Sequence, residues 1–396
     1  MPNNKTLLYT LILLFTLGQV ATDLYLPSLV SITHAFNTDS NMAQFTITAY
    51  VSSMMISQPL YGIASDAYGR RNILLIGSII AILGTFLCCI AWSIKILLLG
   101  RFIQGLGASA GLTVCRAIMR DLYSGPNFIK MASYLAVFGM VCMISAPVLG
   151  GYIEHFFNWR VNFILLLILC IINLINVIFI LPETNLHKHS DHLRIRQVFN
   201  NFIFLLKSYN FVIYSICSML AYANIYAWVT TGPIIIQQVY GLNPIYFGWT
   251  YCASGIFYII GNIFNRRNIH HYGSNKLMMI GFSIQLFSSL ILLTTYMTDF
   301  INVYVIICSI SILMFGVSLV FPNSNAGALN DFTQIAGTAS ALFSILQTSG
   351  AALSSAYIAI TSNHSILPVT FCFIILSLTG LCFSLSINNK VKLSSI

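Results

Sequence analysis

The stretch GIASDAYGRR, from Gly62 to Arg71, is a short charged turn between two long apolar segments. A run of about 20 mainly apolar residues is long enough to cross a bilayer as a helix, and this turn joins two such runs. The whole chain is 58% hydrophobic and only 7% charged, well outside the range of soluble domains. The sequence therefore predicts an all-α membrane protein in which turns of this kind connect spanning helices.

Twelve apolar segments follow one another along the chain. They lie at residues 7–31, 42–63, 73–92, 94–118, 131–152, 161–181, 209–235, 245–264, 277–296, 300–321, 334–360 and 366–387. The only long polar stretch, 182–208, separates the first six from the last six. We therefore expect a six-helix half at 1–181, a cytoplasmic linker at 182–208 and a second six-helix half at 209–396.

Basic residues set the orientation of the spans, because Lys and Arg in short loops stay on the cytoplasmic side. With the amino terminus inside, all but three of the 18 Lys and Arg residues fall on the cytoplasmic side, the exceptions being Lys95, Arg101 and Arg160. We therefore expect both termini in the cytoplasm. The net charge of +9 is scattered in ones and twos between apolar runs, which argues against nucleic acid as a partner.

The sequence contains no motif of a catalytic or nucleotide-binding site, and we predict neither an enzyme nor a bound cofactor or metal. The 10 cysteines all fall in predicted spans and form no CxxC pair, so we interpret them as small packing residues. The linker sequence HKHSDH, residues 187–192, has metal-ligand residue types but no standard ligand spacing. A solvated basic loop is the simpler interpretation.

A weak internal repeat supports the division into halves. AYGRRN follows the second span, and HYGSNK follows the eighth, so an aromatic–glycine pair precedes an apolar run in both. Two six-helix halves with a substrate site between them, near the bilayer midplane, are the architecture of many secondary transporters.

Ionisable residues inside spans are costly and are retained mainly for function. Of the nine acids only Asp23 is well inside a span, whereas Glu154 is expected at an outer loop. A carboxyl group in low dielectric can take up a proton on one side of the membrane and release it on the other. We predict that Asp23 couples transport to protons; the alternative is a helix cap, because Pro27 leaves the carbonyl of residue 23 without its usual donor.

The fourth span, in GRFIQGLGASAGLTVCR (100–116), carries the complementary charge. Arg101 and Gln104 are one turn apart and share a helix face, which predicts a polar site for protons or substrate. The alternative for Arg101 is snorkelling to the outer interface. The small residues that follow predict close helix packing.

Two further groups complete the candidate residues. The fifth span predicts a bending or sliding element at Gly139, Pro147, Gly150 and Gly151. Polar and aromatic residues that could line a cavity are Tyr25, Tyr222, Asn224, Tyr226, Trp228, Asn323 and Asn325. Each alone is explained by packing, and their clustering is what indicates a cavity.

These motifs together resemble the major facilitator superfamily, in its twelve-span drug:proton antiporter branch. GIASDAYGRR is similar to the loop signature between spans two and three, with Gly62, Asp66, Gly69, Arg70 and Arg71 at the signature positions. ATDLYLP (21–27), GRFIQGLGAS (100–109) and APVLGG (146–151) look like further motifs of that branch. TTGPIIIQQVYGLNPIYFG (230–248) and GTASALFSILQTSGAA (337–352) resemble the Bcr/CflA multidrug exporters.

The resemblance implies a rocker-switch exporter of the bacterial inner membrane, driven by proton entry. Asp23 and Arg101 would serve proton coupling and substrate engagement, and the fifth-span motif would mark an antiporter. The expected partners are protons, the lipid bilayer and a small organic substrate such as a drug or an amphipathic metabolite, and the simplest assembly is a monomer. A dedicated siderophore or metabolite exporter and a proton-coupled importer share these motifs and remain alternatives, ahead of a receptor or a membrane enzyme.

The signature turn itself is predicted to be a cytoplasmic gate. Asp66 can pair with a base near a helix end, and Gly62 and Gly69 would allow the close approach that this pairing needs. Such a latch would hold the halves together on the cytoplasmic side in the outward-open state.

Overall fold

The protein was analysed as a computed structural model that describes residues 4–123, 125–185, 195–361 and 365–394. The described residues are helical almost throughout, and they fall into two compact units, Met1–Ile195 and Arg196–Ile396. The predicted all-α class is confirmed.

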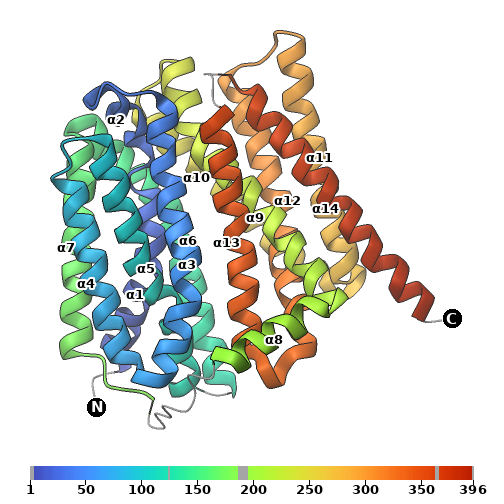
Figure 1. The fold of residues 1–396 in the computed structure, drawn as a ribbon. Coiled ribbons are helices and arrows are strands. Elements are labelled where there is room, and N and C mark those ends of the chain that lie inside the picture. The colour runs from blue at the N-terminus through green and yellow to red at the C-terminus, as the bar shows by residue number, and fades with distance from the viewer. Residues whose placement is uncertain (1–3, 124, 186–194, 362–364, 395–396) are drawn as a thin grey trace. The chain divides into compact units, whose positions relative to one another are not determined.

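The first unit contains the helices coloured blue to green in Figure 1. They are α1 (Asn4–Asp23), the 3₁₀ turn η1 (Leu26–Ser28), α2 (Leu29–Ala35), α3 (Ser40–Tyr68), α4 (Arg70–Cys89), α5 (Ile94–Leu122), α6 (Gly125–Phe156) and α7 (Trp159–Phe179).

The second unit contains the helices coloured yellow-green to red (Figure 1). They are α8 (Ile195–Lys207), α9 (Tyr209–Ile234), the π-helical turn η3 (Ile235–Val239), α10 (Pro244–Tyr272), α11 (Ser274–Met297), α12 (Val303–Leu329), the 3₁₀ turn η4 (Asn330–Ile335), α13 (Ala336–Thr361) and α14 (Leu367–Ser394).

Each of the twelve predicted spans coincides with a long helical stretch in the described part of the chain. Ten of these stretches are long and apolar enough to cross a membrane. The other two, α3 and α10, are each 29 residues long but more polar. In α3 the polar side chains, Ser53 and Ser57 among them, are buried in the protein, so they need not face lipid.

The first span is interrupted, not continuous. α1 ends at Asp23, and the chain passes through η1 before it resumes as α2. Pro27 lies in η1 and has no N–H to donate to the carbonyl of Asp23, which explains why the helix breaks at this point. The break places Asp23 at a helix end inside the protein.

The small residues of α5 bring three neighbouring helices close. A Cβ on Gly105 would collide with Ser53 and the Tyr50 carbonyl of α3, and one on Gly107 would collide with the backbone of α4 at Ala81. A Cβ on Gly111 would collide with the Leu14 carbonyl of α1. α5 is thus the central helix of the first unit, and its glycines serve packing, as predicted.

Part of the stretch predicted as a linker is helical. α8 runs from Ile195 to Lys207 (Figure 1), and its Leu205 packs in a buried cluster with Phe211 of α9 and Ala328 of α12. The histidine-containing segment 187–192 lies outside the described residues.

The turn between α3 and α4 is repeated in the second unit. Gly69 connects α3 to α4 with φ +99° and ψ +150°, and Gly273 connects α10 to α11 with φ +76° and ψ +159°. Side chains rarely adopt positive φ with extended ψ, so both turns need glycine. The weak internal repeat that the two aromatic–glycine pairs predict is therefore present as the same backbone turn in both units.

This requirement can be tested at Gly273, where a Cβ would meet nothing within 4 Å and only the backbone conformation is at stake. We expect Gly273→Ala to cost ~1–2 kcal/mol through φ strain and to lower the apparent melting temperature of the purified protein by a few degrees. The matched control is Gly337→Ala, which also meets nothing within 4 Å but has an ordinary φ. Equal melting temperatures for the two variants would contradict the assignment.

Candidate functional site

The guanidinium group of Arg101 is completely buried in the first unit, between two tyrosine rings. Its Cζ atom lies 4.1 Å from the ring centroid of Tyr25 and 4.1 Å from that of Tyr50. A cation between two aromatic faces is stabilised by both rings, and each desolvated contact contributes about 2 kcal/mol. Arg101 therefore does not snorkel to the outer interface, and Tyr50 is a member of this site that the sequence did not single out.

Hydrogen bonds fix the position of the guanidinium. Arg101 Nη1 donates to the Ala21 carbonyl oxygen at 2.9 Å and to Gln104 Oε1 at 2.5 Å. The Nε2 of Gln104 in turn donates to Thr85 Oγ1 of α4 at 2.9 Å, and Thr85 donates to the Ala81 carbonyl at 2.7 Å. The predicted Arg101–Gln104 face is thus a real pair, and it connects α5 to α1 and to α4.

The two tyrosines are held by their own hydroxyl groups. Tyr50 donates to the carbonyl of Gly18 at 2.6 Å, and the hydroxyl of Tyr25 lies 3.0 Å from Thr46 Oγ1. Each ring is therefore anchored at its far end while its face contacts Arg101. This arrangement ties α3 to α1 and to the break in the first span.

Asp23 lies two residues beyond the carbonyl that Arg101 binds, and its side chain is completely buried. Both carboxylate oxygens accept from Gln19 Nε2, at 3.4 and 3.2 Å. No ion pair joins Asp23 to Arg101 among those formed within the described residues. The structure thus brings the two predicted residues to the same break in the first span, but it leaves the acid bound to a neutral amide.

Two nitrogen atoms of Arg101, Nε and Nη2, are buried and have no hydrogen-bond partner in the described part of the chain. Guanidinium has five N–H donors and stays charged in proteins. The site therefore keeps donor capacity that an acceptor group can use.

The fifth-span motif packs against the break. A Cβ on Gly150 would overlap the Leu24 carbonyl oxygen, and one on Gly139 would lie 3.3 Å from the Phe15 ring of α1. Pro147 lies inside α6, and Gly151 is buried in the same helix. α6 therefore approaches the first span closely at the residue after Asp23.

The prediction for Glu154 was wrong. This acid is in the last turn of α6 and is 8% exposed, not in an outer loop. It accepts a hydrogen bond from Ser28 of η1, and Ser28 accepts from Asn162 Nδ2 of α7 at 2.8 Å. The α6 helix extends beyond the apolar run that marked the fifth span, and these polar partners allow the acid to lie within it.

Arg70 is the centre of the charged turn. Its Nη1 donates to Asp66 Oδ1 at 2.5 Å and to Ser65 Oγ at 2.8 Å, and its Nε donates to Asp121 Oδ2 of α5 at 3.0 Å. The side chain of Asp66 is 58% exposed, whereas that of Arg70 is 10% exposed. The predicted base partner of Asp66 is thus the arginine of its own motif, four residues on.

The segment after α7 is bound to this turn, which the sequence reading did not foresee. Glu183 Oε1 accepts from the backbone N of Arg70 at 2.9 Å, at the amino-terminal end of α4, where a carboxylate is favoured. Thr184 donates to Asp121 at 3.1 Å, and Asn185 Nδ2 donates to the carbonyl of Asp66 at 2.8 Å. In the sequence, only the acid Glu183 and the amide Asn185 of the run LPETN (181–185) could have indicated this contact.

The remaining members of the motif have separate roles. Arg71 donates to the carbonyl oxygens of Val177 and Ile178, at 3.4 and 2.5 Å, and so caps the end of α7. Gly69 supplies the positive φ described above. The expectation of a close approach at Gly62 is not supported, because a Cβ there would be 3.8 Å from Thr113, an ordinary contact.

Among the described residues of the second unit, the buried polar side chains are uncharged. Asn224 Nδ2 of α9 donates to Gln285 Oε1 of α11 at 2.8 Å. Asn323 Nδ2 of α12 donates to Asn265 Oδ1 of α10 at 2.7 Å. The two predicted asparagines therefore bond to different helices, and Gln285 and Asn265 are partners that no motif indicated.

The aromatic residues of α9 lie near these amides. The ring centroids of Tyr222 and Tyr226 are 5.0 Å apart. Trp228 is completely buried, and a Cβ on Gly232 would lie 3.0 Å from its indole ring, so Trp228 packs tightly. Asn325 of α12 is half-buried.

These features define a polytopic α-helical membrane protein with a buried cationic centre beside a broken first span. The sequence model of the Major Facilitator Superfamily matches residues 11–355. The chain belongs to the Major Facilitator Superfamily, a family of membrane transporters.

Relatives agree with the branch that the motifs indicated. The chain is 26% identical over 392 residues to "Bicyclomycin resistance protein homolog" of Haemophilus influenzae, covering 97% of this chain and 98% of that protein. It is 27% identical over 367 residues to "Multidrug resistance protein D" of Escherichia coli, covering 93% and 90%. The resemblance to the drug-resistance branch is thereby confirmed.

A solved structure supports the fold. The crystal structure of a D-xylose-proton symporter matches with a TM-score of 0.76 and 15% sequence identity, covering 96% of each chain. At this identity the likeness shows the shared fold alone.

The contact between α6 and the break gives a testable prediction. We expect Gly150→Ala to lower transport about tenfold or more, because its Cβ would overlap the backbone of Leu24 and displace the residue next to Asp23. Transport in vesicles is the measurement, with protein abundance in the same membranes checked by immunoblot. Gly337→Ala, which adds a methyl group in open space, is the control, and wild-type transport by Gly150→Ala would contradict the close contact.

Proposed function

We propose that the chain is a proton-coupled exporter, an antiporter that expels small organic molecules such as drugs or amphipathic metabolites. One observation carries this proposal: the buried acid Asp23 ends a helix two residues from the carbonyl held by the buried Arg101. The relatives, whose names refer to bicyclomycin and multidrug resistance, support the substrate class.

Asp23 is suited to bind and release a proton. Its only partner in the described hydrogen bonds is the amide of Gln19, which can donate to a carboxylate and can also accept from a protonated acid through its own oxygen. Protonation removes one negative charge beside a permanent positive charge at Arg101. The local field at the break therefore changes with each proton, as coupling requires.

Arg101 is suited to bind the transported substrate. Its unpartnered Nε and Nη2 can donate to a carbonyl or hydroxyl oxygen of a substrate, while the rings of Tyr25 and Tyr50 keep the guanidinium in place. In the second half, Tyr222, Asn224, Tyr226, Trp228, Asn323 and Asn325 remain our candidates for cavity-lining residues. Alternating access by a rocker switch of the two halves would then expose the site to each side in turn.

The chain is proposed to lie in the inner membrane of a bacterium as a monomer with both termini in the cytoplasm. The distribution of Lys and Arg supports this orientation. Charged residues of the turn at Gly62–Arg71 would then lie on the cytoplasmic side.

Proton coupling can be tested with Asp23→Asn in everted membrane vesicles. We expect proton-driven accumulation of bicyclomycin to fall about tenfold or more, because the amide cannot exchange a proton, while bicyclomycin counterflow without a gradient is retained. Asp39→Asn is the control, since Asp39 is exposed and its side chain makes no capping bond to α3. Full gradient-driven accumulation by Asp23→Asn would rule out its role.

The direction of transport is tested with the wild-type protein. Addition of bicyclomycin to energised everted vesicles should release protons from the vesicle lumen, as antiport demands. Proton-driven uptake into right-side-out vesicles would instead identify an importer.

The charged turn is proposed to be the cytoplasmic gate. Arg70 is held by Asp121 and Ser65 in addition to Asp66, so it remains in place while the exposed Asp66 is free to exchange partners during switching. Glu183, which binds the start of α4, would keep the turn rigid during this exchange.

This gate proposal predicts a kinetic effect. Asp66→Asn should slow turnover about tenfold and change the KM of transport less than threefold, because it alters switching and not substrate binding. Asp39→Asn, which removes an exposed acid at the opposite end of α3, again serves as the control. An unchanged maximal rate for Asp66→Asn would count against the gate.

A further inference from the structure

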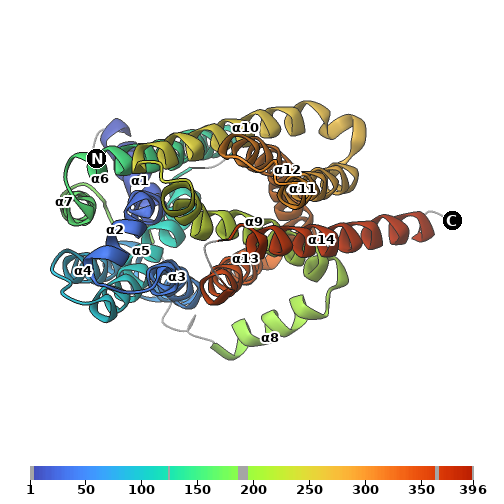
Figure 2. The same ribbon diagram turned by 90° about the horizontal axis from the view of Figure 1, so that it is seen from above.

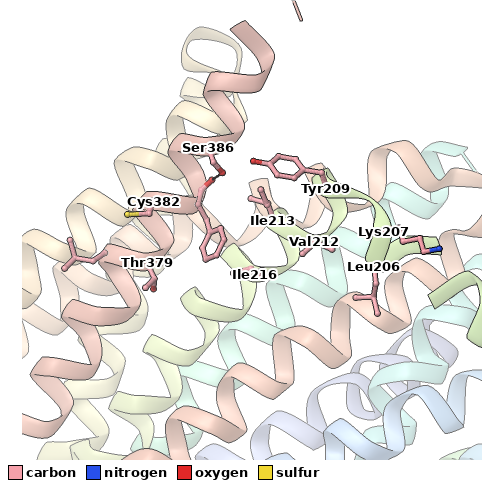
Figure 3. A pocket seen from close by; sticks show the side chains of 11 residues that line it. Leu206, Lys207, Tyr209, Val212, Ile213, Ile216, Thr379, Cys382 and Ser386 are labelled. Atoms are coloured by element: carbon pink, nitrogen blue, oxygen red, sulfur yellow. Dashed lines mark hydrogen bonds between the residues drawn. The ribbon is translucent and has the colours of Figure 1, made fainter. Parts of the chain in front are cut away.

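The second unit has a groove of about 730 Å³ between the end of α8, the start of α9 and the last third of α14 (Figure 3). Its walls are mainly apolar, with Val212 and Ile216 on α9 facing Leu378 and Phe383 on α14. Figures 1 and 2 both show the C-terminal end of α14 standing away from α8 and α9. The groove therefore follows from the divergence of two neighbouring helices.

Polar groups border the groove at two places. Lys207 is the last residue of α8, and it is exposed. Tyr209 of α9 and Ser386 of α14 point toward each other across the groove in Figure 3. The groove thus has an apolar interior, one positive charge at its α8 end and two hydroxyl groups between α9 and α14.

α8, the helix at the Lys207 end of the groove, has the character of an interfacial helix. α8 exposes Phe199, Phe204 and Leu206, which are 62%, 60% and 50% exposed, and ends in a lysine. Helices with exposed apolar residues and basic ends lie in the plane between lipid headgroups and acyl chains. In the proposed orientation this plane belongs to the cytoplasmic leaflet, which carries the anionic lipids.

The charged side chains of the two segments that form the groove are all basic. Residues 195–210 contain Arg196 and Lys207 and no acid, and residues 378–396 contain Lys390 and Lys392 and no acid. A hydrophobic cation would be repelled at the Lys207 end of the groove, and a small soluble anion would gain nothing from the apolar walls. A molecule with both an anionic head and an aliphatic chain satisfies both parts.

We propose that this groove binds an anionic phospholipid of the cytoplasmic leaflet, with its phosphate at Lys207 and one acyl chain between α9 and α14. The site lies within the second unit and is separate from the Asp23–Arg101 centre. It does not depend on the proposed direction or substrate of transport.

The native cysteines provide the test. Cys382 lines the groove and is exposed, and Cys308 of α12 is also exposed but is not among the lining residues. In the purified full-length chain, the rate of maleimide labelling at each cysteine is measured by peptide mass spectrometry. Phosphatidylglycerol and phosphatidylethanolamine with identical acyl chains are added in turn.

We expect phosphatidylglycerol to slow labelling of Cys382 about fivefold more than phosphatidylethanolamine does, the ratio that corresponds to ~1 kcal/mol per basic residue near a lipid surface. Labelling of Cys308 should be the same in both lipids. Lys207→Gln should abolish the difference at Cys382. Lys276→Gln, which removes the same charge from α11 of the same unit, should preserve it.

Three results would overturn the proposal. Equal protection by the two lipids would show a groove that takes acyl chains without regard to the headgroup. Protection by free glycerol phosphate would show a site for a soluble anion. Unchanged labelling of Cys382 in all lipids would show that no lipid occupies the groove.

Discussion

The buried positive charge of Arg101 is the constraint on which the first half of this transporter depends. A guanidinium group removed from water is costly unless aromatic faces and acceptors replace its hydration. Here Tyr25, Tyr50, Gln104 and the Ala21 carbonyl supply them, and they come from the broken first span, α3 and α5. One charge therefore fixes how these helices meet, and it places Asp23 beside the same centre.

Close packing makes this arrangement possible. In lipid the hydrophobic effect does not hold helices together, so contacts between small residues and polar bonds between helices do more of that work. The glycines of α5 admit three helices, and Gly150 of α6 admits the backbone of the break at Leu24. The predicted sliding element thus contacts the residue that follows the predicted proton site.

The two halves share a backbone device but differ in chemistry. Gly69 and Gly273 make the same positive-φ turn in each half, but the ion pairs formed within the described residues, Arg70 with Asp66 and with Asp121, lie at the first turn. The described interior of the second half contains amide pairs such as Asn224 with Gln285, whereas that of the first half contains a buried arginine. This asymmetry agrees with the proposal that Asp23, in the first half, couples transport to protons.

Composition and hydropathy by themselves determined the membrane class, the twelve helices and the glycine turn, because these depend on local residue type. They also singled out Asp23 and Arg101, since a charge within an apolar run is too costly to be incidental. Only the tertiary structure decided the partners: Tyr50 and Thr85 carry no signal as unusual residues for their segments, Glu183 stood out only as the acid of LPETN, and Glu154 was assigned to a loop. Partner choice depends on which helix faces meet, and that is set by packing between segments far apart in the sequence, which no local pattern records.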